Sequence, residues 1–246
     1  MINSTGSKAT MALGAAAIVF MVATLAFGLI FSGPELVQAD SVRLMYLHLP
    51  TIAVAYSGFA ITLVASAIYL RKGSIFWDLV AGSAAEIAVV FTAFLLISGA
   101  LWGRPTWGVY WKWEPRLTST AVMFIMYLGY LALRRLDLPP EVRSRRAAIL
   151  GMLSFINVII VHYSVQWWRG LHQGQSIGLD TQIDGLQLFS LFLGLVAFML
   201  TGAWLLIHRF RVAWLEHQVN QIGFEHALAE RRAESGGGIE LAGGNT

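Results

Sequence analysis

MALGAAAIVFMVATLAFGLIFS, residues 11–32, is an apolar stretch without a single charged side chain. About 20 such residues in a helix cross the ~30 Å hydrocarbon core of a membrane. Lipid offers the backbone no hydrogen-bond partners, and long apolar runs exclude the alternating pattern of a β-barrel. Five further apolar segments follow, at residues 50–70, 79–101, 118–133, 147–165 and 186–207. The sequence therefore predicts an all-α fold, a polytopic membrane helix bundle with six transmembrane helices.

The first segment also has an alternative interpretation, as a cleaved signal peptide. Lys8 precedes it, and Val37-Gln38-Ala39 resembles a cleavage site. Its apolar run, from Met11 to Phe31, is longer than the ~7–15 apolar residues of a signal peptide. We therefore expect a retained helix.

The composition supports the membrane assignment. The chain is 57% hydrophobic and only 13% charged, with a mean hydropathy of +0.63. A net charge of +3 does not indicate nucleic-acid binding, because the basic residues cluster in short segments between apolar runs. Cysteine is absent, so this chain can form neither a disulfide nor a thiolate metal site.

The basic residues predict the orientation in the membrane. With six spans both termini lie on one side, which carries Lys8, Arg71, Lys72, Arg134, Arg135, Arg143, Arg145, Arg146, Arg209, Arg211, Arg231 and Arg232. The other side carries Arg43, Arg104, Lys112, Arg116 and Arg169. The positive-inside rule makes the first side, with both termini, cytoplasmic. Three loops then face outward, at residues 33–49, 102–117 and 166–185.

Two regions are expected along the chain. Residues 1–208 form the six-span membrane domain, and residues 209–246 form a cytoplasmic tail. The tail begins as an amphipathic helix that lies on the membrane surface through Trp214, Leu215, Val219, Ile222 and Leu228. Its Gly-rich end, from Ser235 to Thr246, has too few apolar residues to order itself.

The second outward loop is unusually aromatic. It holds four of the nine tryptophans, namely Trp102, Trp107, Trp111 and Trp113. An aromatic belt at the membrane interface explains one or two tryptophans per helix end. The higher density here favours a flat platform for a planar apolar ligand, with Gly103 and Gly108 permitting close approach. Basic residues of this loop are candidates to meet acidic groups on that ligand: Arg104, Lys112 and Arg116.

Two histidines flank this loop on the same side of the membrane. His48 ends the first outward loop, and His172 lies in the third. Two imidazoles beside an aromatic platform indicate a pair of axial ligands for haem iron. The alternative, that they cap helices or bind water, stays open. His162, near the outer end of the fifth span, is a functional candidate, a hydrogen-bond donor to a ligand, or a packing residue.

Three motifs resemble one known family. They are Trp107-Gly108-x-x-Trp111-x-Trp113-Glu114-x-Arg116-Leu117-Thr118-Ser119, then Tyr46-Leu47-His48-Leu49-Pro50, and His162-Tyr163-Ser164-Val165-x-Trp167-Trp168-x-x-Leu171-His172-Gln173-Gly174. The first is similar to the tryptophan-rich signature of the haem-handling protein superfamily. Together they resemble the haem exporter protein C family of the bacterial cytochrome c maturation system, over roughly residues 10–208.

The resemblance implies a haem site. His48 and His172 would ligate the iron of haem b (iron protoporphyrin IX) from opposite faces. The porphyrin edge would rest on Trp107, Trp111 and Trp113, and the propionates would meet Arg116 and Arg43. Gly108, Trp167 and Trp168 belong to the same motifs. The family usually has Asp where this chain has Glu114, one methylene longer, and Pro115 after it suits the start of the fourth helix.

The resemblance also implies partners and a location. The family presents haem at the periplasmic face of the bacterial cytoplasmic (inner) membrane to a membrane-anchored haem chaperone. It works with the ATPase and permease subunits of an ABC transporter and with a small single-span subunit. This chain has no phosphate-binding Gly-Lys-Ser/Thr motif, so we expect a haem-delivery protein rather than an enzyme.

Three alternatives compete with delivery. A stable b-type cytochrome is expected to hold its iron ligands on facing helices inside the bundle. A transporter is expected to show broken helices and several buried charges, for which Glu86 and His162 are the candidates. A scaffold would not need the Trp-rich loop. Outward loops suit a ligand that must leave again, because loops move more readily than packed helices.

Overall fold

The protein is a bundle of six long helices. The computed structural model describes residues 7–35, 38–172 and 185–242, and within these ranges it contains no strand. The helices are α1 (Lys8–Ala26), α2 (Met45–Lys72), α3 (Ile75–Trp107), α4 (Pro115–Leu133), α5 (Pro140–Trp167) and α6 (Gly185–Ala242). A π-helical turn, η1 (Phe27–Phe31), extends α1, and a short 3-10 helix, η2 (Asp40–Leu44), precedes α2. All six are long and apolar enough to cross a membrane, which confirms the predicted fold.

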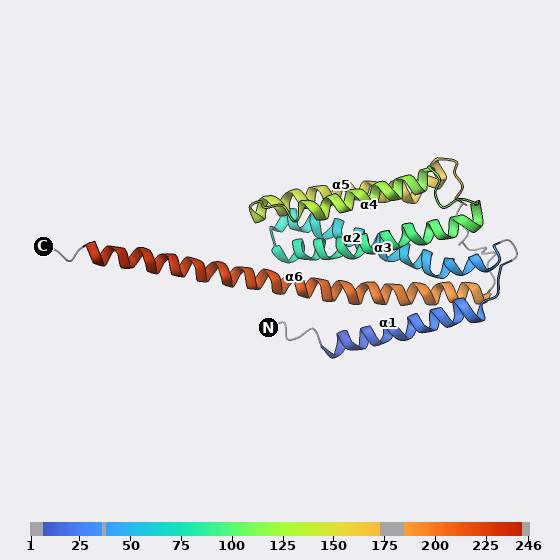
Figure 1. The fold of residues 1–246 in the computed structure, drawn as a ribbon, viewed down its shortest axis with the longest axis horizontal. Coiled ribbons are helices and arrows are strands. Elements are labelled where there is room, and N and C mark those ends of the chain that lie inside the picture. The colour runs from blue at the N-terminus through green and yellow to red at the C-terminus, as the bar shows by residue number, and fades with distance from the viewer. Residues whose placement is uncertain (1–6, 36–37, 173–184, 243–246) are drawn as a thin grey trace.

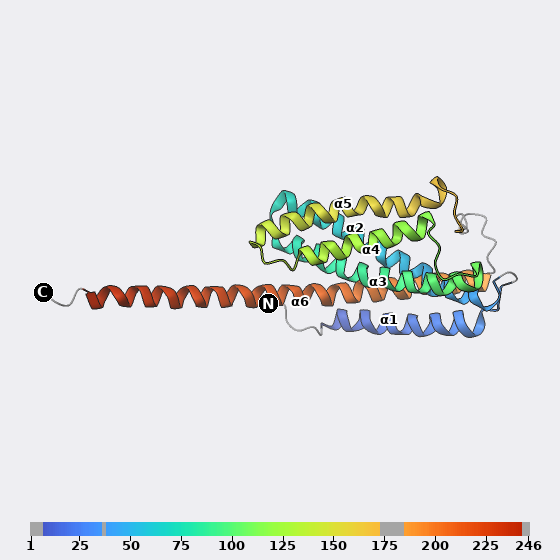
Figure 2. The same ribbon diagram turned by 45° about the horizontal axis from the view of Figure 1, so that its top comes forward.

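The helices pack side by side, with α2 and α3 in the centre. Helices α4 and α5 lie on one side of this pair, and α1 and α6 on the other (Figure 1). The same arrangement is visible after a turn of 45° (Figure 2), where α6 again projects far beyond the end of the bundle. The end of α1, the start of α2, the α3–α4 connection, the end of α5 and the start of α6 lie at the opposite end, as the sequence predicts for the flanks of its three outward loops.

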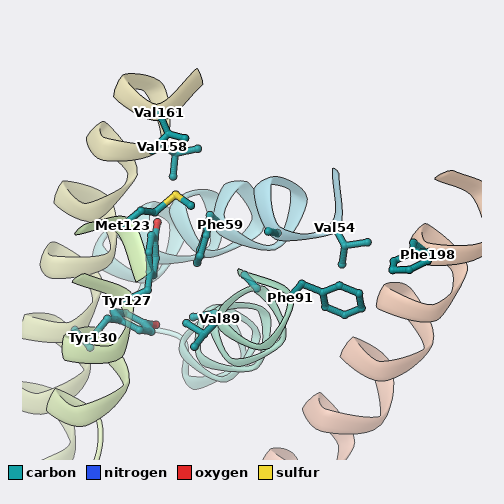
Figure 3. Packing of buried hydrophobic residues seen from close by; sticks show 14 of the residues in the cluster. Val54, Phe59, Val89, Phe91, Met123, Tyr127, Tyr130, Val158, Val161 and Phe198 are labelled. Atoms are coloured by element: carbon teal, nitrogen blue, oxygen red, sulfur yellow. The ribbon is translucent and has the colours of Figure 1, made fainter. Parts of the chain in front are cut away.

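Close helix packing forms the core around α2 and α3. The rings of Phe59 and Tyr127 stack at 3.8 Å between centroids, and Met123 and Val158 pack nearby (Figure 3). A Cβ on Gly58 would lie 2.8 Å from the Cβ of Ala88, so only glycine permits this approach of α2 to α3. Small residues that bring backbones together are the usual means of packing helices in lipid.

Ion pairs tie the helices together toward the end from which α6 projects. Asp78 of α3 is buried and pairs with Arg134, which directly follows α4. Arg209 of α6 donates to both carboxylate oxygens of Glu86 in α3. The two acidic residues of the third span are therefore structural partners at helix–helix contacts, and no substrate path has to be invoked for Glu86.

Two sequence-based boundaries are wrong. Helix α2 begins at Met45, so His48 lies in a helix rather than in a loop, and α3 continues through Trp102 to Trp107. An apolar stretch marks the part of a helix that contacts lipid. The helix itself can continue beyond the lipid at either end. Helix α6 runs unbroken past residue 208 to Ala242. Residues 243–246 lie outside the described ranges. The division at residue 208, the membrane-surface position of the tail and the disorder of its Gly-rich end stay predictions.

Candidate functional site

A cavity of about 730 Å³ opens at the end of the bundle where the three predicted outward loops meet. Cofactor and ligand sites span about 300–1,000 Å³. Its polar and aromatic lining comes from five helices and two loops: Glu35, Gln38, His48, Tyr56, Trp102, Thr106, Trp107, Arg116, Thr120, His162, Gln166, His172 and Gln187. Its apolar lining includes Val42, Met45, Leu49, Ile52, Leu95 and Leu96. The cavity has the mixed character expected of a site for a large, mostly apolar ligand.

His48 enters the cavity from the first turns of α2. Its Nδ1 lies 3.0 Å from Oγ of Ser98 in α3. Its ring meets the Trp102 ring edge to face, with centroids 5.5 Å apart, and Trp102 in turn donates from Nε1 to Oε1 of Gln38 at 2.8 Å. A Cβ on Gly99 would come within 3.0 Å of the His48 ring. The imidazole is therefore held by α3 on more than one side.

Glu114 connects the second and third loops. It caps the N-terminus of α4, since Oε1 accepts from the backbone N–H of Leu117 at 3.0 Å, and Pro115 occupies the first turn as predicted. Its Oε2 accepts from the N–H of Leu171 at 3.2 Å. The side chain is buried, so this carboxylate joins the start of α4 to the segment that carries His172.

His172 lies outside the helices, in the loop after α5. Its Nδ1 is 2.6 Å from Oε1 of Glu114, and its ring packs against Trp107 with centroids 4.8 Å apart. Burial lowers the pKa of His172 below its usual value, and the Glu114 carboxylate opposes this only in part. The imidazole is therefore mainly neutral near pH 7, the form that ligates a metal.

Arg116 places a positive charge in the lining of the same cavity. Its Nη2 donates to the carbonyl oxygen of His162 at 3.3 Å. Its Nε is buried and has no hydrogen-bond partner within the described residues. A guanidinium with a spare buried donor fits an acidic group of a ligand.

Other predicted site residues lie outside the cavity lining. Trp111 and Trp113 pack against each other, with centroids 5.5 Å apart, and Trp113 is 80% exposed. Arg43 pairs with Asp40 at 3.2 Å. Trp167 and Trp168 are exposed, and Gly108 ends α3 with a φ of 78°. Of the three platform tryptophans that the resemblance implies, the structure brings Trp107 alone into this lining.

Sequence reasoning did not single out Ser98, Tyr56 or Trp102 as site residues. Ser98-Gly99 interrupts an otherwise apolar run in α3, and this interruption could have indicated that α3 contributes to a site here. Tyr56 lies further along α2 from His48, and its ring meets that of His162 at 6.3 Å between centroids. His162 also lines the cavity, so it remains a candidate neighbour of the ligand.

Comparison with known proteins identifies the family of this chain. The model of the family described as Heme exporter protein C matches residues 2–224. The chain belongs to this family. Members from Escherichia coli (strain K12) and Haemophilus influenzae are 34% and 33% identical to it over 199 and 202 residues, or 80–81% of each chain. The member from Bradyrhizobium diazoefficiens is 36% identical over 168 residues, 66% of this chain and 62% of that protein.

The family match covers most of this chain and leaves out its C-terminal end. The Heme exporter protein C family model covers α1 to α5, the first part of α6 and all the residues that line the cavity. It ends at residue 224, within α6. The cavity therefore belongs to the shared part of the chain, whereas the last turns of α6 do not.

Proposed function

We propose that this chain binds haem b between His48 and His172 and delivers it to a membrane-anchored haem chaperone during c-type cytochrome biogenesis. One observation carries the proposal. Two histidines from separate parts of the chain line one cavity, and Nδ1 of each lies within 3.0 Å of a side-chain oxygen, that of Ser98 or Glu114. This arrangement leaves Nε2 of each ring to bind iron.

The remaining lining fits haem as the cargo. Within the described residues there is no cluster of three or more His, Asp or Glu side chains that could hold a bare metal ion. Haem brings four porphyrin nitrogens of its own, so two imidazoles complete the ligand set of its iron. Arg116, with its buried Nε, suits a propionate, and Trp107 suits the porphyrin face. The half-buried Trp111, the exposed Trp113 and Arg43 would act at the rim of the site.

Charge supports a periplasmic position for the cavity. The short α2–α3 and α4–α5 connections carry Arg71, Lys72, Arg134 and Arg135 at the end of the bundle opposite the cavity. Basic segments stay in the cytoplasm of a bacterial inner membrane. Haem would then be bound where a periplasmic chaperone can reach it.

Delivery requires that the ligand can leave. His172 lies on a loop, and the cavity is open at the end of the bundle rather than enclosed between spans. A stable b-type cytochrome would hold both ligands on packed helices, and of the proposed pair His48 meets that condition and His172 does not. The ATPase and permease subunits of an ABC transporter and a small single-span subunit are the proposed partners of release, since this chain has no phosphate-binding motif of its own.

Visible spectroscopy of the detergent-purified protein tests the proposal. We expect wild type to bind added haemin with the spectrum of six-coordinate, bis-histidine iron. His48→Ala and His172→Ala should each lose that spectrum. His226→Ala, an exposed histidine on the projecting part of α6, is the matched control and should behave as wild type. Haem retained by both site variants would contradict the ligand pair and point to His162.

The transfer of haem to the chaperone is tested in a separate experiment. Membranes that contain the ABC transporter subunits and the chaperone are assayed for covalent haem on the chaperone. We expect both ligand variants to abolish it and His226→Ala to preserve it. Full chaperone loading with either ligand variant would contradict delivery from this site.

A further inference from the structure

Each of the two cavity histidines has a polar partner at Nδ1, and the two partners are chemically different. Ser98 of α3 faces His48, at 3.0 Å. Glu114, the cap of α4, faces His172, at 2.6 Å. Since a neutral imidazole carries one proton, the partner at Nδ1 decides which nitrogen is left to bind a metal.

The partner of His48 can act as an acceptor. Oγ of Ser98 lies within hydrogen-bond reach of the carbonyl oxygen of Leu95, at 3.2 Å, as well as of Nδ1 of His48, at 3.0 Å. When Ser98 donates its single hydrogen to Leu95, it accepts from His48, and Nδ1 carries the proton. The unprotonated nitrogen of His48 is then Nε2.

The partner of His172 is fixed as an acceptor for another reason. The two oxygens of Glu114 receive the N–H groups of Leu117 and Leu171, as expected of a carboxylate, which only accepts. Oε1 of Glu114, 2.6 Å from Nδ1 of His172, therefore favours the tautomer that carries its proton on Nδ1. A Cβ on Gly170 would lie 2.3 Å from Oε2 of Glu114, so the loop is built around this carboxylate.

We propose that Ser98 and Glu114 are positioning residues that hold His48 and His172 in the tautomer with Nε2 free for haem iron. This inference rests on the proposed function. The two partners differ in how strongly they affect their histidines, because a carboxylate increases the basicity of an imidazole more than a hydroxyl does. His172 is accordingly the stronger electron donor, and its orientation depends on a charged side chain that also anchors its loop.

The test compares haemin affinity and the reduction potential of the bound haem in purified variants. Replacing such partners typically weakens metal binding about 10–100-fold, so we expect this loss in Ser98→Ala and in Glu114→Gln. Glutamine has one acceptor oxygen for three donors, so it cannot replace the carboxylate. Glu114→Gln should also raise the reduction potential, whereas Glu114→Asp, which keeps two acceptor oxygens, should restore both values toward wild type.

Ser164→Ala is the matched control. Ser164 is also buried near this end of the bundle and also donates to the carbonyl oxygen three residues earlier, that of Val161, at 2.7 Å. No described histidine side chain contacts it, so its affinity and potential should equal wild type. Circular dichroism and size-exclusion profiles of the haem-free variants separate lost positioning from lost folding, and we expect both to match wild type.

The outcomes distinguish the two proposals. Wild-type affinity and potential in Ser98→Ala and Glu114→Gln, together with haem loss in His48→Ala and His172→Ala, would overturn the positioning roles alone. Haem retained by the two histidine variants would overturn the ligand pair, and the positioning roles with it. An equal loss in Ser164→Ala and Ser98→Ala would also count against a role specific to Ser98.

Discussion

Arg134 donates to both carboxylate oxygens of Asp78, from Nη1 to Oδ1 at 2.6 Å and from Nη2 to Oδ2 at 2.8 Å. Nη1 also lies 3.4 Å from the hydroxyl of Tyr130. Asp78 stands in the first turn of α3 and Arg134 at the end of α4, so the pair joins the centre of the bundle to its α4–α5 side. A bidentate geometry with both partners largely buried makes this contact structural.

Removing one partner of this pair should destabilise the protein strongly. Asp78→Ala leaves the Arg134 guanidinium buried without its anion, which typically costs about 3–5 kcal/mol. We expect a lower Tm in detergent, measured by circular dichroism. The double variant Asp78→Leu/Arg134→Met removes both charges and should recover much of the loss. A double variant as unstable as Asp78→Ala would contradict this account.

Gly170→Ala should weaken haem binding without unfolding the bundle. The added Cβ would meet Oε2 of Glu114 at 2.3 Å and force the carboxylate away from Leu171 and His172. We expect about tenfold weaker haemin binding, at the lower end of the range for residues that orient a metal ligand. Titration of the purified protein measures it.

Gly185→Ala is the control for that substitution. A Cβ on Gly185, at the start of α6, would meet nothing within 4 Å, and the residue lies at the same end of the bundle. Its affinity should equal wild type. Equal affinities in the two alanine variants would show that the loop adjusts and that the position of Glu114 is not critical.

The tryptophans of the aromatic loop should differ in their effects. Trp107 lines the cavity and packs on His172, whereas Trp113 is 80% exposed and lies outside the lining. An aromatic pair contributes about 0.5–1.5 kcal/mol beyond its buried area, so Trp107→Ala should weaken haemin binding by roughly threefold to tenfold. Trp113→Ala should change it less than twofold. The reverse order would place the porphyrin on the Trp111–Trp113 pair instead.

The overall architecture was predictable because hydropathy reports directly on contact with lipid. Six apolar runs predicted six helices, and alternation of the chain across the membrane predicted that His48 and His172 share one end. The contents of the site were harder to predict. Hydropathy began the second span at residue 50, too late to include His48, whereas α2 begins at Met45.

Contacts between distant segments were not predictable from the sequence. Ser98 meets His48 across 50 positions, and this contact depends on the rotation of α3 relative to α2. Glu114 was recognised at the neck of its loop, and Pro115 correctly marked the start of α4. Its contacts with Leu171 and His172, however, arise only when the second and third loops fold against each other.

Haem binding should respond to pH through His172. Iron competes with a proton for Nε2, so affinity is constant above the pKa of His172 and falls as pH drops below it. Burial lowers that pKa from 6.5, and Glu114 raises it in part. We therefore expect affinity to be flat from about pH 8 to pH 6.5 and to decline only below this range.

The direction in which Glu114 shifts the pKa of His172 gives a more specific test of this pH dependence. Glu114→Gln removes the effect that raises the pKa of His172, so the imidazole stays neutral to lower pH than in wild type. Haem binding by this variant should be weaker at neutral pH, yet its decline should begin at a lower pH. Haemin titrations across the pH range measure both values, with Asp137→Asn, an exposed carboxylate in the α4–α5 connection, as the control. A decline that begins at the same or a higher pH in Glu114→Gln would mean that a group other than His172 limits binding in acid.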